Sequence, residues 1–109
     1  MATENKLSVF AQSVYDVVRS VPRGKVVSYA DVAQALGMRS ARAVGQALRR
    51  NPFAPEVPCH RVVTSDGGLG GFWGGADEVR LRQKESLLSS ERVAVAHGRI
   101  DMTLFRHSL

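Results

Sequence analysis

Apolar residues near the amino terminus recur at the spacing of one helical face. The pattern begins after Ser8 and stops at Pro22-Arg23-Gly24. Its members are Val9, Phe10, Val14, Val17 and Val18. This spacing predicts a scaffold helix that buries the apolar face. Residues 1–7 lack the pattern and are expected to form a loose tail, with residues 8–109 forming one domain.

The next polar and apolar residues predict two short helices joined by a tight turn. Ser28 is a good N-cap, and Asp31 three residues later gives a capping-box-like start to a helix over residues 29–36. Gly37 ends this helix, and a second helix over residues 41–50 stops at Asn51-Pro52. The pair matches a helix-turn-helix, which is also common as a plain packing unit and is a weak signal for DNA binding by itself.

The composition of the second predicted helix strengthens that signal. It combines small residues, which let a backbone approach closely, with arginines that suit a phosphate backbone. The small residues are Ala41, Ala43, Gly45 and Ala47, and the arginines are Arg42, Arg49 and Arg50. Small side chains with one projecting arginine suit a narrow groove, where an inserted side chain can replace a base in the stack.

The following segment places the single cysteine after a restricted loop. Pro52, Pro55 and Pro58 limit the backbone before Cys59, and residues 59–63 are expected to form a buried strand or an extended turn. A turn at residues 65–68 leads into residues 67–75, where six of nine residues are glycine.

The remainder of the chain is expected to form a helix and a hairpin. Charged residues surround Val79, Leu81, Leu87 and Leu88, which predicts a helix over residues 76–90. Residues 93–96 and 99–102 flank His97-Gly98 and predict a closing hairpin. The fold class is therefore mainly α with short β segments.

Length and composition exclude several classes of protein. The chain has 109 residues, 44% of them apolar and 23% charged, which argues against disorder and against tandem catalytic modules. No apolar stretch approaches a membrane span, and the first residues lack a signal pattern. One cysteine cannot form an internal disulfide, and three scattered histidines give no zinc spacing. We expect a cytoplasmic or nuclear monomer without metal or cofactor.

The net charge of +5 is unevenly distributed. Residues 1–50 hold eight cations against three anions, whereas residues 51–109 hold seven of each. An acidic partner, with a phosphate backbone as the leading candidate, would therefore meet the amino-terminal half. Charge alone leaves a plain soluble surface equally open, because +5 is in the range that keeps small domains soluble.

Cys59 beside His60 is the candidate for chemistry. A thiol has a pKa of about 8.5, so it needs a base to become a nucleophile at neutral pH. Neighbouring side chains of an extended segment point to opposite faces, so either a turn or a water must connect the two. Glu91 is one of several carboxylates that could orient the imidazole. The alternative is a buried structural cysteine beside a satisfied histidine.

A family resemblance favours a reactive Cys59 over a structural one. Pro58-Cys59-His60-Arg61-Val62-Val63 resembles the active-site signature of the O6-alkylguanine-DNA alkyltransferases, also called methylated-DNA–protein-cysteine methyltransferases. Other segments resemble this family in the same order along residues 9–91, namely Ser28-Tyr29, Ala41-Arg42-Ala43-Val44-Gly45, Asn51-Pro52, Gly70-Gly71-Phe72 and residues 84–91. The resemblance implies a winged helix-turn-helix-like fold, as in the carboxyl-terminal domain of these transferases.

The resemblance also implies a role for each matched residue. Cys59 would accept the alkyl group, His60 would be its water-mediated base, Glu91 would orient His60, and Asn51 would brace the turn. Tyr29 would help rotate the target nucleotide and donate to guanine N3, and Arg42 would fill the vacated stack. Ser65 and Lys84 would contact the extruded base. The pocket would also be lined by Pro58, Val62, Val63, Phe72 and Trp73.

Some segments differ from the typical transferases. No segment matches their amino-terminal domain, the loop between Gly75 and Lys84 is longer, and Trp73 stands where a small residue is common beside the pocket. The tail at residues 98–106 resembles the alkyltransferase-like proteins, which bind alkylated guanine without accepting the group and direct it to nucleotide excision repair. Those proteins generally replace the active cysteine, which is present here.

Three functions follow from these observations. The leading one is single-turnover transfer of a methyl or other alkyl group from O6-alkylguanine in duplex DNA to Cys59, in the cytoplasm with the nucleoid, or in the nucleus of a eukaryote. The alternative is a lesion sensor that acts with nucleotide excision repair proteins. A helix-turn-helix regulator is the third, and it has no need of Cys59, His60 and Glu91.

Overall fold

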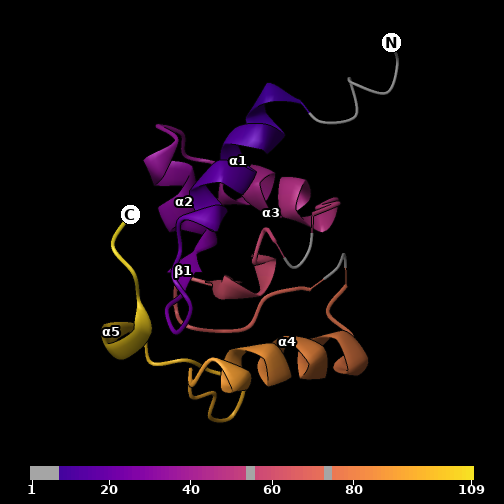
Figure 1. Ribbon diagram of the computed structural model, residues 1–109, viewed down its shortest axis with the longest axis vertical. Helices are drawn as coiled ribbons and strands as arrows, with labels where there is room; N and C mark the ends of the chain where they lie inside the picture. Colours follow the sequence, from indigo (N-terminus) through magenta and orange to yellow (C-terminus); the bar gives the residue numbers. More distant parts are fainter. Residues whose placement is uncertain (1–7, 54–55, 73–74) are drawn as a thin grey trace.

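Figure 1 shows the computed structural model, which describes residues 8–53, 56–72 and 75–109. The elements in chain order are α1 (Val9–Arg19), β1 (Val27–Ser28), α2 (Tyr29–Ala35), α3 (Ala41–Arg49), the 3₁₀ helix η2 (Cys59–Arg61), β2 (Val62–Val63), α4 (Glu78–Ser90) and α5 (Met102–Phe105). Helices α1, α2 and α3 form one layer, α4 lies on the opposite side, and η2 and the strands lie between them. The mainly helical fold class is confirmed.

Helix α1 forms as predicted and buries most of its apolar face. Val14, Tyr15 and Val18 are buried against α2 and α3, and the Ser8 side chain accepts from the Ala11 N–H to cap the helix. The prediction for Val9 was wrong, because this side chain is 85% exposed. The first turn of α1 projects beyond the helices that cover the rest of the face (Figure 1).

The predicted helix-turn-helix is confirmed in α2 and α3, each within one residue of its predicted end. Ser28 and Asp31 form the capping box of α2, with reciprocal bonds of 3.0 Å. Gly37 adopts a φ of +72° after α2, a conformation that favours glycine. The Ser40 side chain caps α3 by accepting from the Ala43 N–H.

The cysteine segment is a turn and not a strand over its first three residues. Cys59–Arg61 form η2, closed by a bond of 2.9 Å from the Arg61 N–H to the Pro58 carbonyl, and only Val62–Val63 are extended. Strand β2 pairs in parallel with β1, with Val27 opposite Val62 and Ser28 opposite Val63. The turn buries both Cys59 and His60, whereas an extended segment would place one of them on the other face.

The carboxyl-terminal part differs from the prediction in two places. Residues 76–83 are mostly the first turns of α4, which begins at Glu78 after its cap Asp77, so the expected longer loop is not a loop. His97 and Gly98 form the tight turn of the predicted hairpin, with φ of 54° and 74°. The predicted hairpin was wrong beyond the single bridge between Ala96 and Arg99. The Ile100 N–H donates to the Gly67 carbonyl and not to the opposite strand of a hairpin, and α5 follows.

Two apolar clusters hold these layers together. The larger one lies among α1, α2, α3 and η2, and the smaller one joins β2 and α4 to residues 93–105. Within the described part of the chain, no helix is long and apolar enough to cross a membrane.

Candidate active site

A cavity of about 550 Å³ opens between the helix-turn-helix and the glycine-rich segment. Cys59 lies on its wall, beside residues of α2 and α3. The described lining residues are Tyr29, Ala41, Arg42, Gly45, Gln46, Leu48, Arg49, Cys59, Gly71, Phe72, Gly75 and Ala76. The thiol therefore faces a space of the size that small-molecule sites occupy.

The loop before Cys59 is fixed by Asn51. Its amide nitrogen donates to the Val57 carbonyl at 3.0 Å, and its amide oxygen accepts from the Phe53 N–H at 2.8 Å. Burial raises the pKa of the Cys59 thiol, and a hydrogen bond from Asn51 partly offsets this rise. The thiol is therefore neutral in the free protein and needs a base at the moment of reaction.

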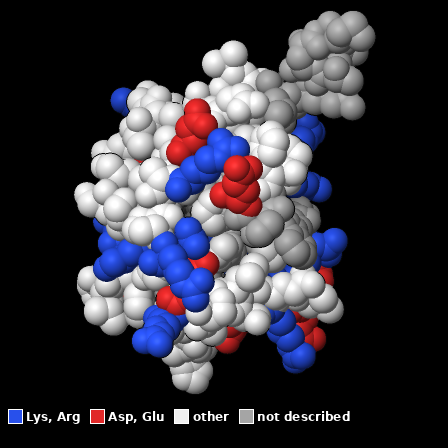
Figure 2. Space-filling model, viewed as in Figure 1, with Lys and Arg blue, Asp and Glu red and all other residues white. Residues whose placement is uncertain are grey.

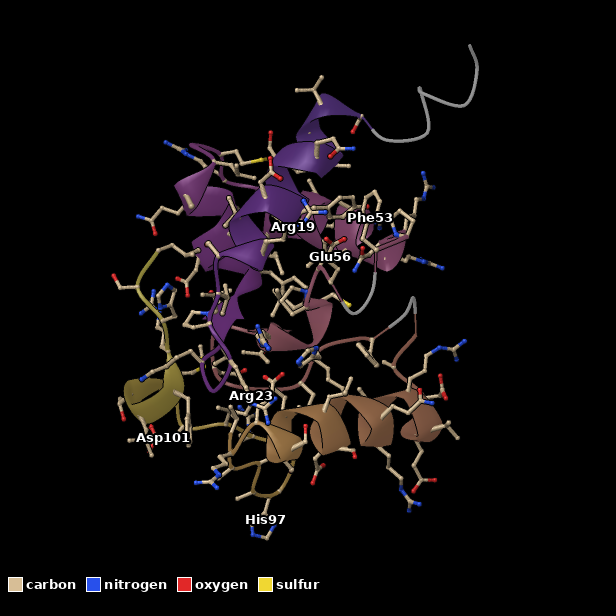
Figure 3. All side chains as sticks on the ribbon, in the orientation of Figure 1. Arg19, Arg23, Phe53, Glu56, His97 and Asp101 are labelled. Carbon is tan, nitrogen blue, oxygen red and sulfur yellow. The ribbon has the colours of Figure 1, made fainter. Side chains whose placement is uncertain are left out.

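Helix α1 supports the same loop from outside. Figure 3 shows Arg19, Phe53 and Glu56 close together. The Arg19 guanidinium lies 5.5 Å from the centre of the Phe53 ring and 3.8 Å from a Glu56 oxygen, and Tyr15 meets Phe53 edge to face. These contacts connect α1 to two residues of the loop that leads to Cys59.

His60 and Glu91 form a buried pair next to the thiol. Nε2 of His60 lies 2.9 Å from Oε2 of Glu91, and both side chains are almost fully buried. Burial lowers the pKa of His60, and the bond to Glu91 opposes that effect. A neutral imidazole held by a carboxylate is suited to accept a proton.

Arg61 binds the same carboxylate and was not assigned a role from the sequence. Its Nε and one terminal nitrogen donate to the two Glu91 oxygens at 2.9 and 2.7 Å, and its other terminal nitrogen donates to the Val21 carbonyl. Burial raises the pKa of Glu91, but bonds from Arg61 and His60 outweigh burial and lower this pKa to about 2. Glu91 is therefore a permanent anion at neutral pH.

The end of α4 is tied down where Glu91 follows it. The Arg23 guanidinium donates to the Ser90 carbonyl at 2.9 Å, and Figure 3 shows Arg23 directed at this helix end. The backbone of Glu91 also lies close to Gly24. Glu91 is thus positioned both through its backbone and through its side chain.

Lys84 is a buried cation that binds the backbone of the glycine-rich segment. Its side chain is fully buried, and Nζ donates to the carbonyls of Val62, Leu69 and Gly71 at 2.7, 2.5 and 2.9 Å. Burial lowers the pKa of Lys84 to about 7, and the neighbouring Cys59 opposes this shift. Through these three bonds Lys84 shapes the cavity wall, and its ammonium donates to backbone carbonyls.

Tyr29 lines the cavity and packs beside two glycines. A Cβ at Gly70 would lie 3.0 Å from the Tyr29 ring, and a Cβ at Gly45 would lie 3.9 Å from it. Gly70 has a φ of +70°, so both the close approach and the backbone conformation require glycine there. Burial raises the pKa of Tyr29, which keeps its hydroxyl a donor.

The arginines of α3 and of its C-cap are exposed. Arg42 and Arg49 line the cavity, whereas Arg50 is exposed outside it. Ala41 and Gly45 line the cavity, and Ala43 lies on α3 without lining it. Small side chains and two arginines therefore meet at the mouth of the cavity.

Five of the predicted pocket residues lie away from the described lining. Pro58, Val62 and Val63 are buried outside the described lining. Lys84 meets the wall through the Gly71 carbonyl and through the Tyr29 ring, whose centre lies 5.8 Å from Nζ. Ser65 is exposed in the turn after β2. Phe72 lines the cavity as expected, and Trp73 lies outside the described residues.

The arrangement is that of a helix-turn-helix domain with a buried thiol, imidazole and carboxylate beside its basic helix. The sequence profile of the family described as "6-O-methylguanine DNA methyltransferase, DNA binding domain" matches residues 9–93. The chain belongs to this family.

Similar proteins agree with this assignment. A methylated-DNA–protein-cysteine methyltransferase of Methanothermobacter thermautotrophicus is 43% identical over 86 residues, which are 79% of this chain and 46% of the relative. A protein of the same name from Metallosphaera sedula is 50% identical over 75 residues, 69% of this chain and 45% of the relative. The chain spans about half the length of these curated relatives.

Two solved structures with DNA are also similar. S. pombe Atl1, in complex with damaged DNA containing O6-carboxymethylguanine, superposes with a TM-score of 0.81 at 27% identity, covering 92% of this chain and 95% of Atl1. Mycobacterium tuberculosis OGT in complex with DNA gives a TM-score of 0.70 at 38% identity, covering 78% of this chain and 49% of OGT.

Proposed function

We propose that this protein repairs duplex DNA by transferring the alkyl group of O6-alkylguanine to Cys59. The observation that carries the proposal is the position of the Cys59 thiol on a cavity between the basic helix α3 and Tyr29, one residue from the buried His60–Glu91 pair. The names of the relatives and the DNA in the two similar structures support the substrate class.

The target base must leave the duplex to reach this thiol. The O6-alkyl carbon has to lie in line with the sulfur, which a stacked base cannot achieve. We propose that Arg42, at the mouth of the cavity, fills the space that the base leaves in the stack. Tyr29 would help to rotate the nucleotide and would donate a hydrogen bond to guanine N3. Arg49 and Arg50 would bind phosphates.

The reaction is one displacement. Nε2 of His60 is bound to Glu91, so Nδ1 is the nitrogen that takes the thiol proton, through a water. The sulfur forms a bond to the alkyl carbon as the carbon–oxygen bond breaks, and that electron pair stays on guanine, which takes up a proton. A thioether on Cys59 and intact guanine result. No step regenerates the thiol, so each molecule reacts once, without metal or cofactor.

The test follows the fate of the lesion in DNA. An equimolar duplex with one O6-methylguanine is incubated with the wild type, Cys59→Ala and His60→Ala, and restored guanine is quantified by nucleoside analysis. The wild type should restore guanine in a single turnover, His60→Ala should do so at least about a hundredfold more slowly, and Cys59→Ala should not. Restoration by Cys59→Ala would reject Cys59 as the acceptor.

A lesion sensor is the second candidate, and one observation favours it. The similarity to Atl1 extends over nearly the whole of both chains, whereas the similarity to OGT extends over about half of the OGT chain. In that case the wild type would bind the lesion duplex more tightly than plain duplex and leave the methyl group in place, with nucleotide excision repair proteins as partners. Under either function we propose a monomer that acts where the chromosome is, which in a prokaryote is the nucleoid.

A further inference from the structure

The carboxyl-terminal residues 105–107 pair with the residue that precedes β1. The Val26 N–H donates to the Phe105 carbonyl at 2.9 Å, and the His107 N–H donates to the Val26 carbonyl at 2.7 Å. This parallel bridge adds a third extended segment beside β1 and β2. Figure 1 shows the segment running along β1 toward α2. Residues 105–107 also lie beyond residues 9–93, which the family profile matches.

Arg106 in this segment binds Asp31 at the start of α2. Its Nε donates to Asp31 Oδ2 at 3.0 Å, and a second guanidinium nitrogen donates to Oδ1. The Asp31 side chain is 10% exposed and that of Arg106 is 55% exposed. On the face seen in Figure 2, basic side chains gather at the level of β1 and α5. A half-exposed ion pair adds little to the stability of the fold. The two-bond contact with Arg106 matters more because it fixes the orientation of the Asp31 carboxylate.

Asp31 already holds the junction between β1 and α2. Its Oδ2, which accepts from Arg106, also accepts from the Ser28 N–H at 3.0 Å, and the Ser28 side chain caps the Asp31 N–H. Burial raises the pKa of Asp31, but the bonds from Arg106 and Ser28 hold it below its usual value, so the carboxylate stays charged. The bidentate contact therefore fixes the orientation of the capping box.

Tyr29 lies inside this capping box, as the first residue of α2. Its ring packs beside Gly70, where even a Cβ would lie 3.0 Å away, and its centre lies 5.8 Å from Nζ of the buried Lys84. A rotation of the first turn of α2 would move the ring along the cavity wall. Lining residues that are displaced by about 1 Å can slow a reaction by up to about a hundredfold.

We propose that the carboxyl-terminal segment, residues 105–107, positions the lesion site from outside it, with Arg106 as a positioning residue that acts on Tyr29 through Asp31. This inference rests on the proposed function, because it assigns Tyr29 to the rotated nucleotide. Neither Arg106 nor Asp31 is among the described lining residues of the cavity, so Arg106 would reach Tyr29 through the start of α2. Loss of the pair should slow alkyl transfer about tenfold and weaken the preference for lesion duplex.

The test is a double-mutant cycle between Arg106→Gln and Tyr29→Ala. The single-turnover transfer rate and the ratio of affinities for lesion and plain duplex are measured for the wild type, both single variants and the double variant. If Arg106 acts through Tyr29, Arg106→Gln slows transfer about tenfold in the wild type and less than about twofold in Tyr29→Ala. Asp31→Asn should behave as Arg106→Gln does, and Arg106→Lys should be intermediate.

Arg99→Gln is the matched control. Arg99 lies in the same carboxyl-terminal part and forms an exposed pair with Asp66 at 2.7 Å, remote from α2. It should leave rate and preference unchanged, and urea unfolding of each variant confirms that it is folded. Should Arg106→Gln fail to fold, Arg106→Lys carries the same cycle.

Two results would overturn the inference. One is an equal effect of Arg106→Gln with and without the Tyr29 ring, and the other is a folded Arg106→Gln with wild-type rate and preference. A wild type that binds the lesion but transfers nothing rejects the transfer function alone. The cycle is then decided by the affinity ratio, so the two failures are distinguishable.

Discussion

The buried carboxylate of Glu91 should make the stability of this protein depend on acid in a defined window. The pKa of Glu91 falls from its ordinary value of 4.5 to about 2 in the folded chain, because Arg61 and His60 bind its ionised form. Between these two values the unfolded chain binds a proton that the folded chain does not. Stability from this group is therefore fully present above pH 4.5 and is lost as the pH falls toward about 2.

The size of this effect follows from the two pKa values. Their difference corresponds to a maximum of about 3 to 4 kcal/mol of unfolding free energy. At pH 2.5 Glu91 has not yet bound its proton fully in the folded chain, so less than this maximum is lost there, and we expect a loss of about 2 kcal/mol. In Glu91→Gln the group no longer ionises, and this part of the acid dependence disappears.

The assay is urea unfolding of the wild type and Glu91→Gln between pH 7 and pH 2.5. The variant should be less stable at pH 7, and the gap should narrow by about 2 kcal/mol as the pH falls below 4.5. Glu78→Gln removes an exposed carboxylate at the other end of α4 and should change stability by less than about 0.5 kcal/mol. A gap between wild type and Glu91→Gln that stays constant over this range would refute the reasoning.

Two further predictions concern the backbone and the DNA face. Gly67→Ala places a Cβ 2.1 Å from the Ile100 carbonyl oxygen and should cost several kcal/mol, whereas Gly37→Ala, with φ of +72° and open space, should cost about 1 kcal/mol. Chemical denaturation of both variants measures this, and equal losses would contradict the packing of residue 100 on Gly67. Arg42→Ala should weaken binding to lesion duplex by about tenfold at moderate salt, as measured by fluorescence anisotropy, with Arg82→Ala on the exposed face of α4 as control. An unchanged affinity would contradict the proposal that Arg42 fills the space left by the rotated base.

Local signals explain which parts of the fold could be predicted from sequence. Helices α1 to α3 carry their own caps at Ser8, Ser28 and Ser40, and their apolar spacing matches one buried face. Those signals act within a few residues and need no tertiary partner. The spacing of the apolar residues places Val9 on the same face. Its side chain is nevertheless exposed, because the neighbouring helices do not extend far enough to cover it.

Tertiary contacts explain what the sequence did not reveal. The turn at Cys59 depends on burying both Cys59 and His60, and the pair of Arg106 with Asp31 joins residues 75 positions apart. The signature around Cys59 named the reactive residues through resemblance. It gave no sign that Arg61 shares the Glu91 carboxylate, or that the ammonium of Lys84 binds three carbonyls. Long side chains in such a signature are candidates for partners of a buried charge.

The mass of the protein after reaction with a duplex that contains one O6-methylguanine tests the central claim most directly. Intact-protein mass spectrometry followed by peptide mapping would identify both the gain and its position. We predict that the wild type gains a single methyl group on the peptide that contains Cys59, and that the oligonucleotide loses the same group. An unchanged protein mass with intact lesion, in a sample that binds the lesion duplex more tightly than plain duplex, would contradict transfer and leave lesion sensing as the function.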